Sequence, residues 1–549
     1  MVRLALVAAI LAWTVYPAIG GPPLNVSFPP QPPADALANI INDNYLGISY
    51  ELSSFDTLWG QSVNRQPTAM QNYMSNIAAR MSLPLNIRIG GNGMDGSTYV
   101  PTQTTIIEHT DPNAYFNDIP VNFGPGFFDI LNGMADKVGP MRFTIGLSMR
   151  FPEDLTNVAT LGVAAREKLG DRLEALMLGN EPDLYAGHGE KETYDIETYI
   201  TEIGSALDAL EQAGAITDVP IVGGPTICCG WKLKDILDAG LDRYPQYKFY
   251  SVQRYPNHAC GGVNAKNTNI TYYVTHSNLE DYLNWQRDGI LRAQEIGIPV
   301  IMSEYNNIAC GGTNISSTFA MSLWSVDVGL KAATMNYSSI YIHTREFNIQ
   351  YNLFDPPTPE TGTEPGWRTG SPYYGALFLS EITSPGGSVV VDLNLNNSMT
   401  SPNATAAAYA IYDNAGTTRG KLALINYAEE PQEFRLPSGI ASGLEYRLLE
   451  APSVLERTNI SWAGQTVGDN GNLEGDQHTI EMNCEDGCRL ILPGPSAALV
   501  VLDDGAKLFK GNSTIASIGG YISAAKTNGP LVEASTVLLA GAIFTLFFY

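Results

Sequence analysis

A regular alternation of short apolar runs with longer amphipathic stretches limits most strongly the folds that this sequence can adopt. Eight apolar runs follow one another over about 330 residues, and helical stretches separate most of them. The predicted strands are Tyr45–Tyr50, Leu85–Ile89, Arg142–Leu147, Ala175–Leu178, Val219–Gly223, Tyr247–Gln253, Ile298–Glu304 and Ser339–His343. The predicted helices are Thr68–Met81, Phe127–Val138, Leu155–Leu169, Tyr194–Ala213, Leu279–Ile296 and Ser317–Asn336. This pattern predicts an α/β fold, a (β/α)8 TIM barrel, with catalytic groups at the carboxyl ends of its strands.

Two of the predicted strands lead into loops that begin with a glutamate. The fourth strand is followed by Gly-Asn180-Glu181-Pro, and the seventh brings Glu304 into a polar Tyr-Asn-Asn segment, about 120 residues later. Either segment alone is compatible with an ordinary turn that carries a solvated carboxylate. Together, two carboxylates at two strand ends are the minimum that hydrolysis of a glycosidic bond requires.

The character of the sequence changes after about Ser384, where short alternating segments replace the helical stretches. These segments include Ser388–Asp392, Ala406–Tyr412, Lys421–Tyr427, Gln432–Leu436 and Ala497–Leu502, and turn residues separate them. We therefore predict a catalytic barrel over residues 21–383, which includes a Pro-rich lead-in, and a C-terminal β-sandwich over residues 384–505. Residues 506–523 are predicted to form a polar stalk.

Both ends of the chain resemble processing signals. Residues 1–20 combine Arg3, an apolar run and small residues, as a secretory signal peptide does. Residues 524–549 carry a polar spacer and a short apolar tail after small residues, which predicts a GPI-attachment propeptide, with Ser523 as the attachment site and Asn528 as second choice. A short tail anchor is the alternative. We expect an extracellular protein, held at the cell surface or cell wall through a GPI anchor.

The charge balance limits the possible partners. Acidic residues outnumber basic ones 56 to 31, for a net charge of −25, and this argues against nucleic acid or a sulfated polymer as ligand. The acidity is equally compatible with a role in solubility alone. We expect a monomer that contacts a membrane only through its anchor.

Six cysteines and several glycosylation sequons agree with an oxidising, extracellular environment. Cys484 and Cys488 are expected to close a small loop. Cys228 and Cys229 are adjacent, so strain disfavours a bond between them, and their pairing with Cys260 and Cys310 stays open. A zinc site is the competing interpretation, but the usual spacings are absent. Predicted glycosylation sites are Asn25, Asn269, Asn314, Asn336, Asn396, Asn403, Asn459 and Asn512.

The strand-end motifs resemble those of a known group of enzymes. An Asn-Glu pair after strand four and a Glu after strand seven resemble clan A of the retaining glycoside hydrolases. Gly-Asn180-Glu181-Pro, Ser-Glu304-Tyr and Cys310-Gly311-Gly312 resemble, within that clan, glycoside hydrolase family 79, the family of heparanase and microbial β-glucuronidases. The resemblance covers residues 25–505.

The resemblance implies a role for each matching residue. Glu181 would be the acid/base and Glu304 the nucleophile, while Asn180 would bind the sugar 2-hydroxyl and Tyr255 the nucleophile. Backbone amides of Gly311 and Gly312 would hold the carboxylate of a uronic acid, as an anion nest does. The family usually has a tyrosine before these glycines, and this chain has Cys310. Glu51 and Asn92 would contact other hydroxyls of the sugar.

The expected function is therefore that of a secreted, retaining, exo-acting β-glucuronidase. Its substrate would be a glycan such as arabinogalactan that ends in β-linked glucuronic acid or its 4-O-methyl ether, and it needs no metal or cofactor. The sparse basic residues near the strand ends disfavour a heparanase-like endo-enzyme. A clan A β-glycosidase for a neutral sugar, such as a xylosidase or glucosidase, is the other alternative. A non-catalytic protein that binds cell-wall glycans is disfavoured because both carboxylates are present.

Overall fold

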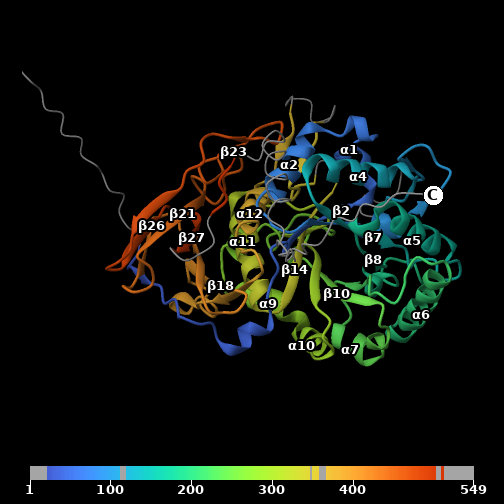
Figure 1. Cartoon of the computed structure of the whole chain (residues 1–549), viewed down its shortest axis with the longest axis horizontal. Helices are drawn as coiled ribbons and strands as arrows, with labels where there is room; N and C mark the ends of the chain where they lie inside the picture. The colour runs from blue at the N-terminus through green and yellow to red at the C-terminus, as the bar shows by residue number, and fades with distance from the viewer. Residues whose placement is uncertain (1–20, 112–118, 346–348, 358–365, 503–507, 512–549) are drawn as a thin grey trace, which may run out of the picture.

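The structure is a computed structural model that describes residues 21–511 except for 112–118, 346–348, 358–365 and 503–507. A barrel surrounded by helices and an antiparallel β-domain lie side by side (Figure 1). The predicted signal peptide, Ser523, the GPI propeptide, most of the stalk and Asn512 lie outside the described residues. Among the described residues, no helix is both long and apolar enough to cross a membrane.

Eight parallel strands form the closed barrel, and the predicted fold class is confirmed. They are β2 (Leu46–Glu51), β3 (Leu85–Gly90), β7 (Met141–Leu147), β8 (Leu173–Leu178), β9 (Val222–Ile227), β10 (Tyr247–Arg254), β12 (Val300–Tyr305) and β14 (Tyr337–Thr344). The last strand, β14, pairs with the first, β2, and closes the barrel. Most predicted strands agree with the observed ones to within two residues at each end.

The fifth strand departs most from its predicted position. The prediction was Val219–Gly223, but Val219 is 70% exposed in the preceding loop and the strand begins at Val222. Its buried part contains Gly223-Gly224-Pro225, which resembles a turn in sequence. A Cβ on Gly223 would lie 2.4 Å from the Phe249 ring, so the glycine is there because β9 and the neighbouring β10 side chain are closely packed.

The inside of the barrel is filled by two layers of side chains. The lower layer is an apolar plug of Ala175, Met177, Phe249, Ile301 and Tyr341. Because side chains on a strand alternate between faces, the residues two positions further on also point inward, toward the carboxyl ends of the strands. Most of those residues are polar. The barrel is thus a closed core below and a polar site above.

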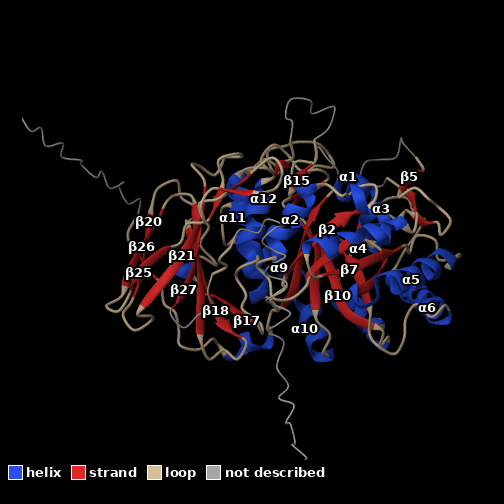
Figure 2. Cartoon of the chain, turned by 45° about the horizontal axis from the view of Figure 1, so that its top comes forward, coloured by secondary structure: helices blue, strands red, loops and turns tan. Residues whose placement is uncertain are grey.

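Helices surround the barrel (Figure 2). The longer ones are α2 (Thr68–Ala78), α4 (Gly126–Val138), α5 (Thr156–Leu169), α6 (Ile196–Gln212), α10 (Arg287–Ile296), α11 (Phe319–Thr334) and α12 (Ser371–Leu379). The predicted helix Leu279–Ile296 is divided into α9 (Asn278–Leu283), a 3-10 turn and α10. α11 is buried along all but its last residue because it lies between the barrel and the β-domain.

The β-domain contains two main sheets and a two-stranded sheet of β23 (Thr466–Val467) and β24 (Leu473–Glu474). The larger contains β17 (Ser388–Asp392), β18 (Ala406–Asp413), β19 (Arg419–Asn426), β27 (Ser496–Leu502), β21 (Gly443–Glu450), β22 (Ser461–Trp462) and β25 (Ile480–Asn483). The smaller contains β1 (Leu24–Asn25), β20 (Gln432–Leu436) and β26 (Cys488–Leu492). The Pro-rich lead-in was assigned to the barrel domain, but its β1 pairs with β20, so it is part of the β-domain. An apolar cluster that includes Val26 and Phe434 fills this domain.

A buried charged network joins the two domains. His276, between α8 (Ile270–Tyr273) and α9, contacts Asp327 of α11 at 2.9 Å through Nδ1 and Asp392 of β17 at 3.0 Å through Nε2. Lys331 of α11 contacts Asp392 at 3.1 Å. Although burial alone would lower it, the two aspartates raise the pKa of His276 to about 10. A charged imidazole therefore holds the domains together at neutral pH.

Three disulfides account for the six cysteines. The expected Cys484–Cys488 bond is present, and Cys260 pairs with Cys310. The expectation that Cys228 and Cys229 do not bond to each other was wrong, since they form the third disulfide. Their loop folds around the carboxylate of Asp183, a long-range contact that the spacing of the cysteines does not reveal.

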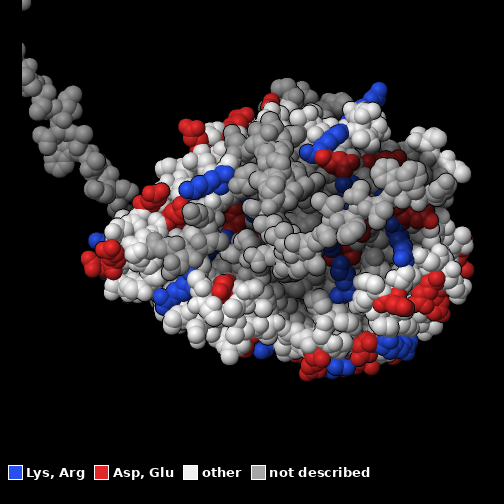
Figure 3. Space-filling view, viewed as in Figure 1, with Lys and Arg blue, Asp and Glu red and all other residues white. Residues whose placement is uncertain are grey.

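The distribution of charged side chains on the surface agrees with a chain in which acidic residues outnumber basic ones. On the face shown in Figure 3, Lys and Arg side chains are scattered among Asp and Glu side chains and form no continuous basic patch. Each sequon asparagine within the described residues is at least partly exposed. Glycosylation at these positions stays a prediction.

Candidate active site

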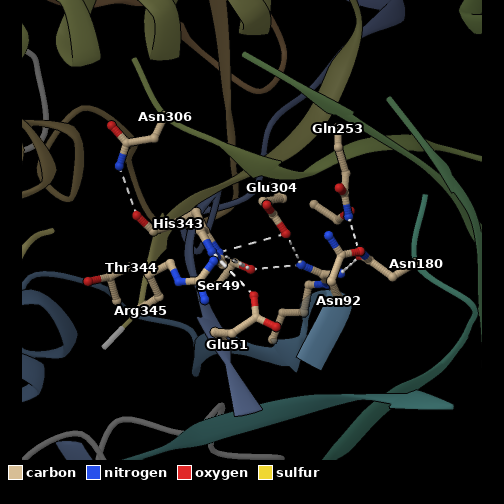
Figure 4. A network of polar contacts seen from close by, with 12 residues as sticks. Ser49, Glu51, Asn92, Asn180, Gln253, Glu304, Asn306, His343, Thr344 and Arg345 are labelled. Carbon is tan, nitrogen blue, oxygen red and sulfur yellow. Dashed lines mark hydrogen bonds and ion pairs between the residues drawn. The ribbon is translucent and has the colours of Figure 1, made fainter. Parts of the chain in front are cut away.

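Arg88 is the centre of the polar layer inside the barrel. It lies at an inward position of β3 and is 1% exposed. Its Nη1 donates to Glu304 Oε2 at 2.7 Å and to Ser49 Oγ at 2.9 Å, and its Nη2 donates to Asn180 Oδ1 at 2.7 Å. Figure 4 shows three of these partners, Ser49, Asn180 and Glu304, converging from different parts of the barrel. One guanidinium thus connects the ends of β2, β8 and β12.

Glu304 lies on β12 and is 8% exposed. Its Oε2 accepts from Arg88, and its Oε1 accepts from the Tyr255 hydroxyl at 2.9 Å. His343 Nδ1 lies 3.7 Å from Oε2. Burial alone would raise the pKa of the Glu304 carboxyl, but the charge of Arg88 and the hydrogen bonds from Arg88 and Tyr255 outweigh burial and lower that pKa. Glu304 is therefore held as a carboxylate.

Glu181 follows β8 and has a left-handed backbone conformation, with φ of 49°. Its N–H donates to Thr226 O at 3.1 Å, which ties the loop after β8 to the end of β9. Burial and the negative charges of Glu304 and Asp183 raise the pKa of Glu181 well above its ordinary value. Glu181 is thus held in the protonated form, opposite to Glu304.

Asn180 and Gln253 connect the two carboxyl groups. Asn180 Nδ2 donates to Asn92 Oδ1 at 2.7 Å, while its Oδ1 accepts from Arg88. The Gln253 amide is buried between Asn180 and Glu181. In one orientation it donates to Asn180 Oδ1 at 2.8 Å, and after half a turn it donates to Glu181 Oε1 at 3.0 Å. Gln253 therefore lies within hydrogen-bonding distance of both Asn180 and Glu181.

Glu51 and His343 lie on the other side of the site. The Gly93 N–H donates to Glu51 Oε1 at 2.5 Å, and His343 Nε2 lies 3.8 Å from Glu51 Oε2. Burial, together with the charges of Arg345 and Arg88, lowers the pKa of His343 to about 4. The imidazole is therefore neutral near pH 7 and is available for hydrogen bonding.

A pocket of about 410 Å³ opens above this layer. Six of the predicted site residues line it, namely Glu51, Asn92, Asn180, Glu181, Tyr255 and Glu304. The other lining residues are Leu184, His188, Cys228, Cys229, Arg254, Pro256, Asn257, His258, Cys260, Ala309, Cys310, His343, Arg345 and Tyr351. Strand ends that are far apart in sequence thus share one cavity, as is usual for this fold.

Gly311 and Gly312 do not lie on the pocket wall, although Cys310 beside them does. A Cβ on Gly312 would lie 2.7 Å from Ser316 Oγ, so this glycine packs closely against the side chains of Ser316 and Gln350. The predicted anion nest at these glycines stays a prediction. Of two aromatic residues that could line the mouth, Tyr351 does, whereas Trp367 packs outside it.

The sequence prediction missed Arg88, Gln253, His343 and Arg345 as parts of the site. Arg88 and His343 each occupy an alternate, inward position in a strand that is otherwise largely apolar. A polar residue at such a position near the carboxyl end of a barrel strand is the signal that would have found them. Arg345 follows β14 directly, so it too lies at the carboxyl end of a barrel strand.

The geometry can support general acid and nucleophilic chemistry without further groups. One carboxyl favours its protonated form and the other its ionised form, and both face one pocket. Such a division is what glycosidases use to protonate a leaving oxygen while a carboxylate attacks or stabilises the sugar.

Comparison with known proteins agrees with this chemistry. Residues 408–499 match the profile described as "Glycosyl hydrolase family 79 C-terminal beta domain". A protein named Beta-glucuronidase from Neurospora crassa is 25% identical over 71% of this chain and 73% of its own length. A second Beta-glucuronidase, from Aspergillus niger, is 26% identical over 72% of this chain and 74% of its own length.

Solved structures share the fold. A 4-O-α-L-rhamnosyl-β-D-glucuronidase from Fusarium oxysporum superposes with a TM-score of 0.72 at 21% identity, over 87% of this chain and 100% of that one. A family 51 α-L-arabinofuranosidase from Thermotoga petrophila gives 0.58 at 13% identity, over 88% and 100%. The barrel fold, the site with two carboxyl groups and the similarity to these enzymes together define the protein as a glycoside hydrolase. Within that class, the match of the C-terminal β-domain and the likeness to the two β-glucuronidases support glycoside hydrolase family 79, the family that the motifs predicted.

Proposed function

We propose that this protein is a retaining β-glucuronidase that releases terminal glucuronic acid, or its 4-O-methyl ether, from a glycan. One observation carries the proposal: two carboxyls in one pocket have pKa values shifted in opposite directions. At mildly acidic pH, Glu181 is an acid while Glu304 is a carboxylate. Double displacement requires this division of roles.

The reaction would proceed in two steps. Glu304 attacks the anomeric carbon while Glu181 gives its proton to the glycosidic oxygen, so the aglycone leaves as an alcohol and the sugar is bound to Glu304 as an ester. Glu181, now ionised, then takes a proton from water, whose oxygen displaces Glu304 from the anomeric carbon. Arg88 and Tyr255 hold Glu304 in place and stabilise its charge in the ionised state.

An acidic protein needs a local partner for an acidic sugar, and Arg345 supplies the positive charge. It lines the pocket beside His343 and is 3% exposed. A guanidinium in a partly enclosed pocket suits a carboxylate, because it can donate two parallel hydrogen bonds. We therefore assign recognition of the uronate carboxylate to Arg345, with the amides of Gly311 and Gly312 as the alternative.

The proposal of exo-action rests on the lining of the pocket. Among its described lining residues, the Lys and Arg side chains are Arg254 and Arg345, and Arg254 lies over the Trp285 ring at 4.6 Å. So little positive charge suits one carboxylate better than a sulfated chain. The names of the two fungal relatives, both β-glucuronidases, and of the Fusarium glucuronidase support the substrate class.

The test compares p-nitrophenyl β-glucuronide with the matching β-glucoside and β-xyloside, for the wild type, Glu304→Gln and Arg345→Gln. We expect turnover of the glucuronide alone, loss of turnover in Glu304→Gln, and a fall of about 10–100-fold in kcat/KM in Arg345→Gln. Arg142→Gln, an exposed arginine on β7, is the matched control. Turnover of a neutral glycoside instead would keep the two-glutamate mechanism and reject the uronic acid. Normal glucuronide turnover in Arg345→Gln would favour the glycine loop.

We also propose that the enzyme is secreted and carried on a GPI anchor at Ser523, on the basis of the terminal sequences. Phosphatidylinositol-specific phospholipase should release the protein from intact cells. Retention after that treatment, with a C-terminal peptide beyond Ser523 still present in the mature protein, would favour a tail anchor.

A further inference from the structure

The disulfide between Cys228 and Cys229 lies on the pocket wall, held there by an acidic side chain from the neighbouring loop. The Asp183 carboxylate accepts backbone N–H groups from four successive residues, Cys228 at 3.2 Å, Cys229 at 2.8 Å, Gly230 at 2.6 Å and Trp231 at 3.4 Å. Four donors on one carboxylate fix the loop after β9 against the loop after β8. The disulfide is therefore a positioned part of the site.

The same loops contain the proposed general acid. Glu181 lies two residues before Asp183, and its own N–H binds Thr226, two residues before Cys228. Leu184, from the loop after β8, lines the pocket together with both cysteines. Leu184 and the two cysteines thus give this side of the pocket an apolar surface beyond Glu181, and His188 of the same loop also lines the pocket.

The position of that surface indicates what it meets. A general acid must face the glycosidic oxygen, so the group bonded to that oxygen lies on the side of Glu181. The released sugar would instead lie over Glu304, on the side of the pocket that Arg345 and His343 line. The surface formed by Leu184, Cys228 and Cys229 is therefore directed at the aglycone.

The chemistry of the surface selects the kind of aglycone. A disulfide is uncharged and polarizable and forms weak hydrogen bonds, so it packs best against C–H groups. A pyranose presents such a C–H face, whereas a sulfate or carboxylate would lose solvation here without gaining a partner.

We propose that Cys228–Cys229 and Leu184 form the subsite for the first aglycone residue, and that this subsite takes the C–H face of a neutral sugar. The inference rests on the proposed glucuronidase function and adds the substrate class beyond the cleaved bond.

The test separates aglycone binding from the chemistry at the glucuronic acid. The variant is Cys228→Ala/Cys229→Ala, and the matched control is Cys484→Ala/Cys488→Ala, which removes a disulfide from the β-domain. The substrates are β-glucuronyl fluoride, whose leaving group has no ring, and a β-glucuronosyl galactose disaccharide. We expect kcat/KM for the disaccharide to fall about tenfold in the variant while that for the fluoride stays within about twofold. The control should change neither.

Three results would overturn the inference. An equal fall for both substrates would mean that the disulfide only positions Glu181, and an unchanged disaccharide rate would mean that it contributes no binding. Wild-type enzyme that cleaves neither substrate would reject the glucuronidase function itself. If the double variant does not fold, Leu184→Ala keeps the disulfide and should still slow the disaccharide selectively, by about threefold; an equal effect of Leu184→Ala on the fluoride would likewise reject the subsite.

Discussion

Replacement of Arg88 by methionine tests the electrostatic basis of the site. Methionine keeps much of the length and the apolar stem of arginine but donates no hydrogen bond. The change removes hydrogen bonds of 2.7 Å to Glu304, 2.7 Å to Asn180 and 2.9 Å to Ser49 from a residue that is 1% exposed. Glu304 then keeps Tyr255 as its hydrogen-bond donor but loses its cation.

The size of the effect follows from the loss of that cation. An opposite charge in contact lowers a carboxyl pKa by about 1–3 units, and one unit corresponds to about 1.4 kcal/mol. Without Arg88, the pKa of Glu304 should rise by about 1–3 units, because burial is no longer outweighed. Removal of one partner from a buried ion pair also costs about 3–5 kcal/mol of stability, which protonation of Glu304 partly relieves.

The assay is the pH dependence of kcat/KM on p-nitrophenyl β-glucuronide. Activity falls at low pH as the nucleophile is protonated, so a raised pKa of Glu304 should move the acidic limb to higher pH by about 1–3 units in Arg88→Met. Arg142→Met, a surface arginine paired with Glu174 on the adjacent strand, should leave the limb in place. An acidic limb that does not move in folded Arg88→Met would refute the reasoning.

Three further predictions concern single residues. Glu181→Ala should lower kcat about 10²–10⁴-fold on a disaccharide and much less on the fluoride, which needs no protonation; equal losses on both would contradict its role as acid. Tyr255→Phe removes a hydrogen bond to the nucleophile and should lower kcat/KM about tenfold, as measured at the pH optimum, and an unchanged rate would contradict the contact. Asp327 and Asp392 raise the pKa of His276 to about 10, although burial alone would lower it. The charged imidazole therefore stabilises the folded protein fully below the unfolded pKa of histidine, about 6.5, and this stabilisation is lost as the pH rises toward 10. The Tm should therefore fall between pH 7 and 10 in the wild type and less steeply in His276→Gln; parallel Tm curves would contradict this.

The barrel and the two glutamates were predictable because both depend on local patterns. Apolar runs of strand length alternate with helical stretches, and Glu181 and Glu304 each follow such a run directly. The features that were missed depend on contacts between distant segments. Gly223 of β9 is explained by the Phe249 ring, and the pairing of Cys228 with Cys229 accompanies a loop that folds around Asp183. The sequence around these residues does not indicate which distant residues they contact.

Arg88 shows that part of the missed site was within reach of the sequence. In the run Leu85–Ile89, the apolar residues at 85, 87 and 89 face the helices, so the residues between them must face the barrel interior. An arginine there cannot be buried without an anion, and the anions available at that level are the carboxylates at the strand ends. Once a barrel with Glu304 at the end of strand seven is predicted, Arg88 is thus an expected partner of the nucleophile. The same argument from alternation identifies His343 in the last strand, where a polar side chain at an inward position must find its partners among the groups at the strand ends.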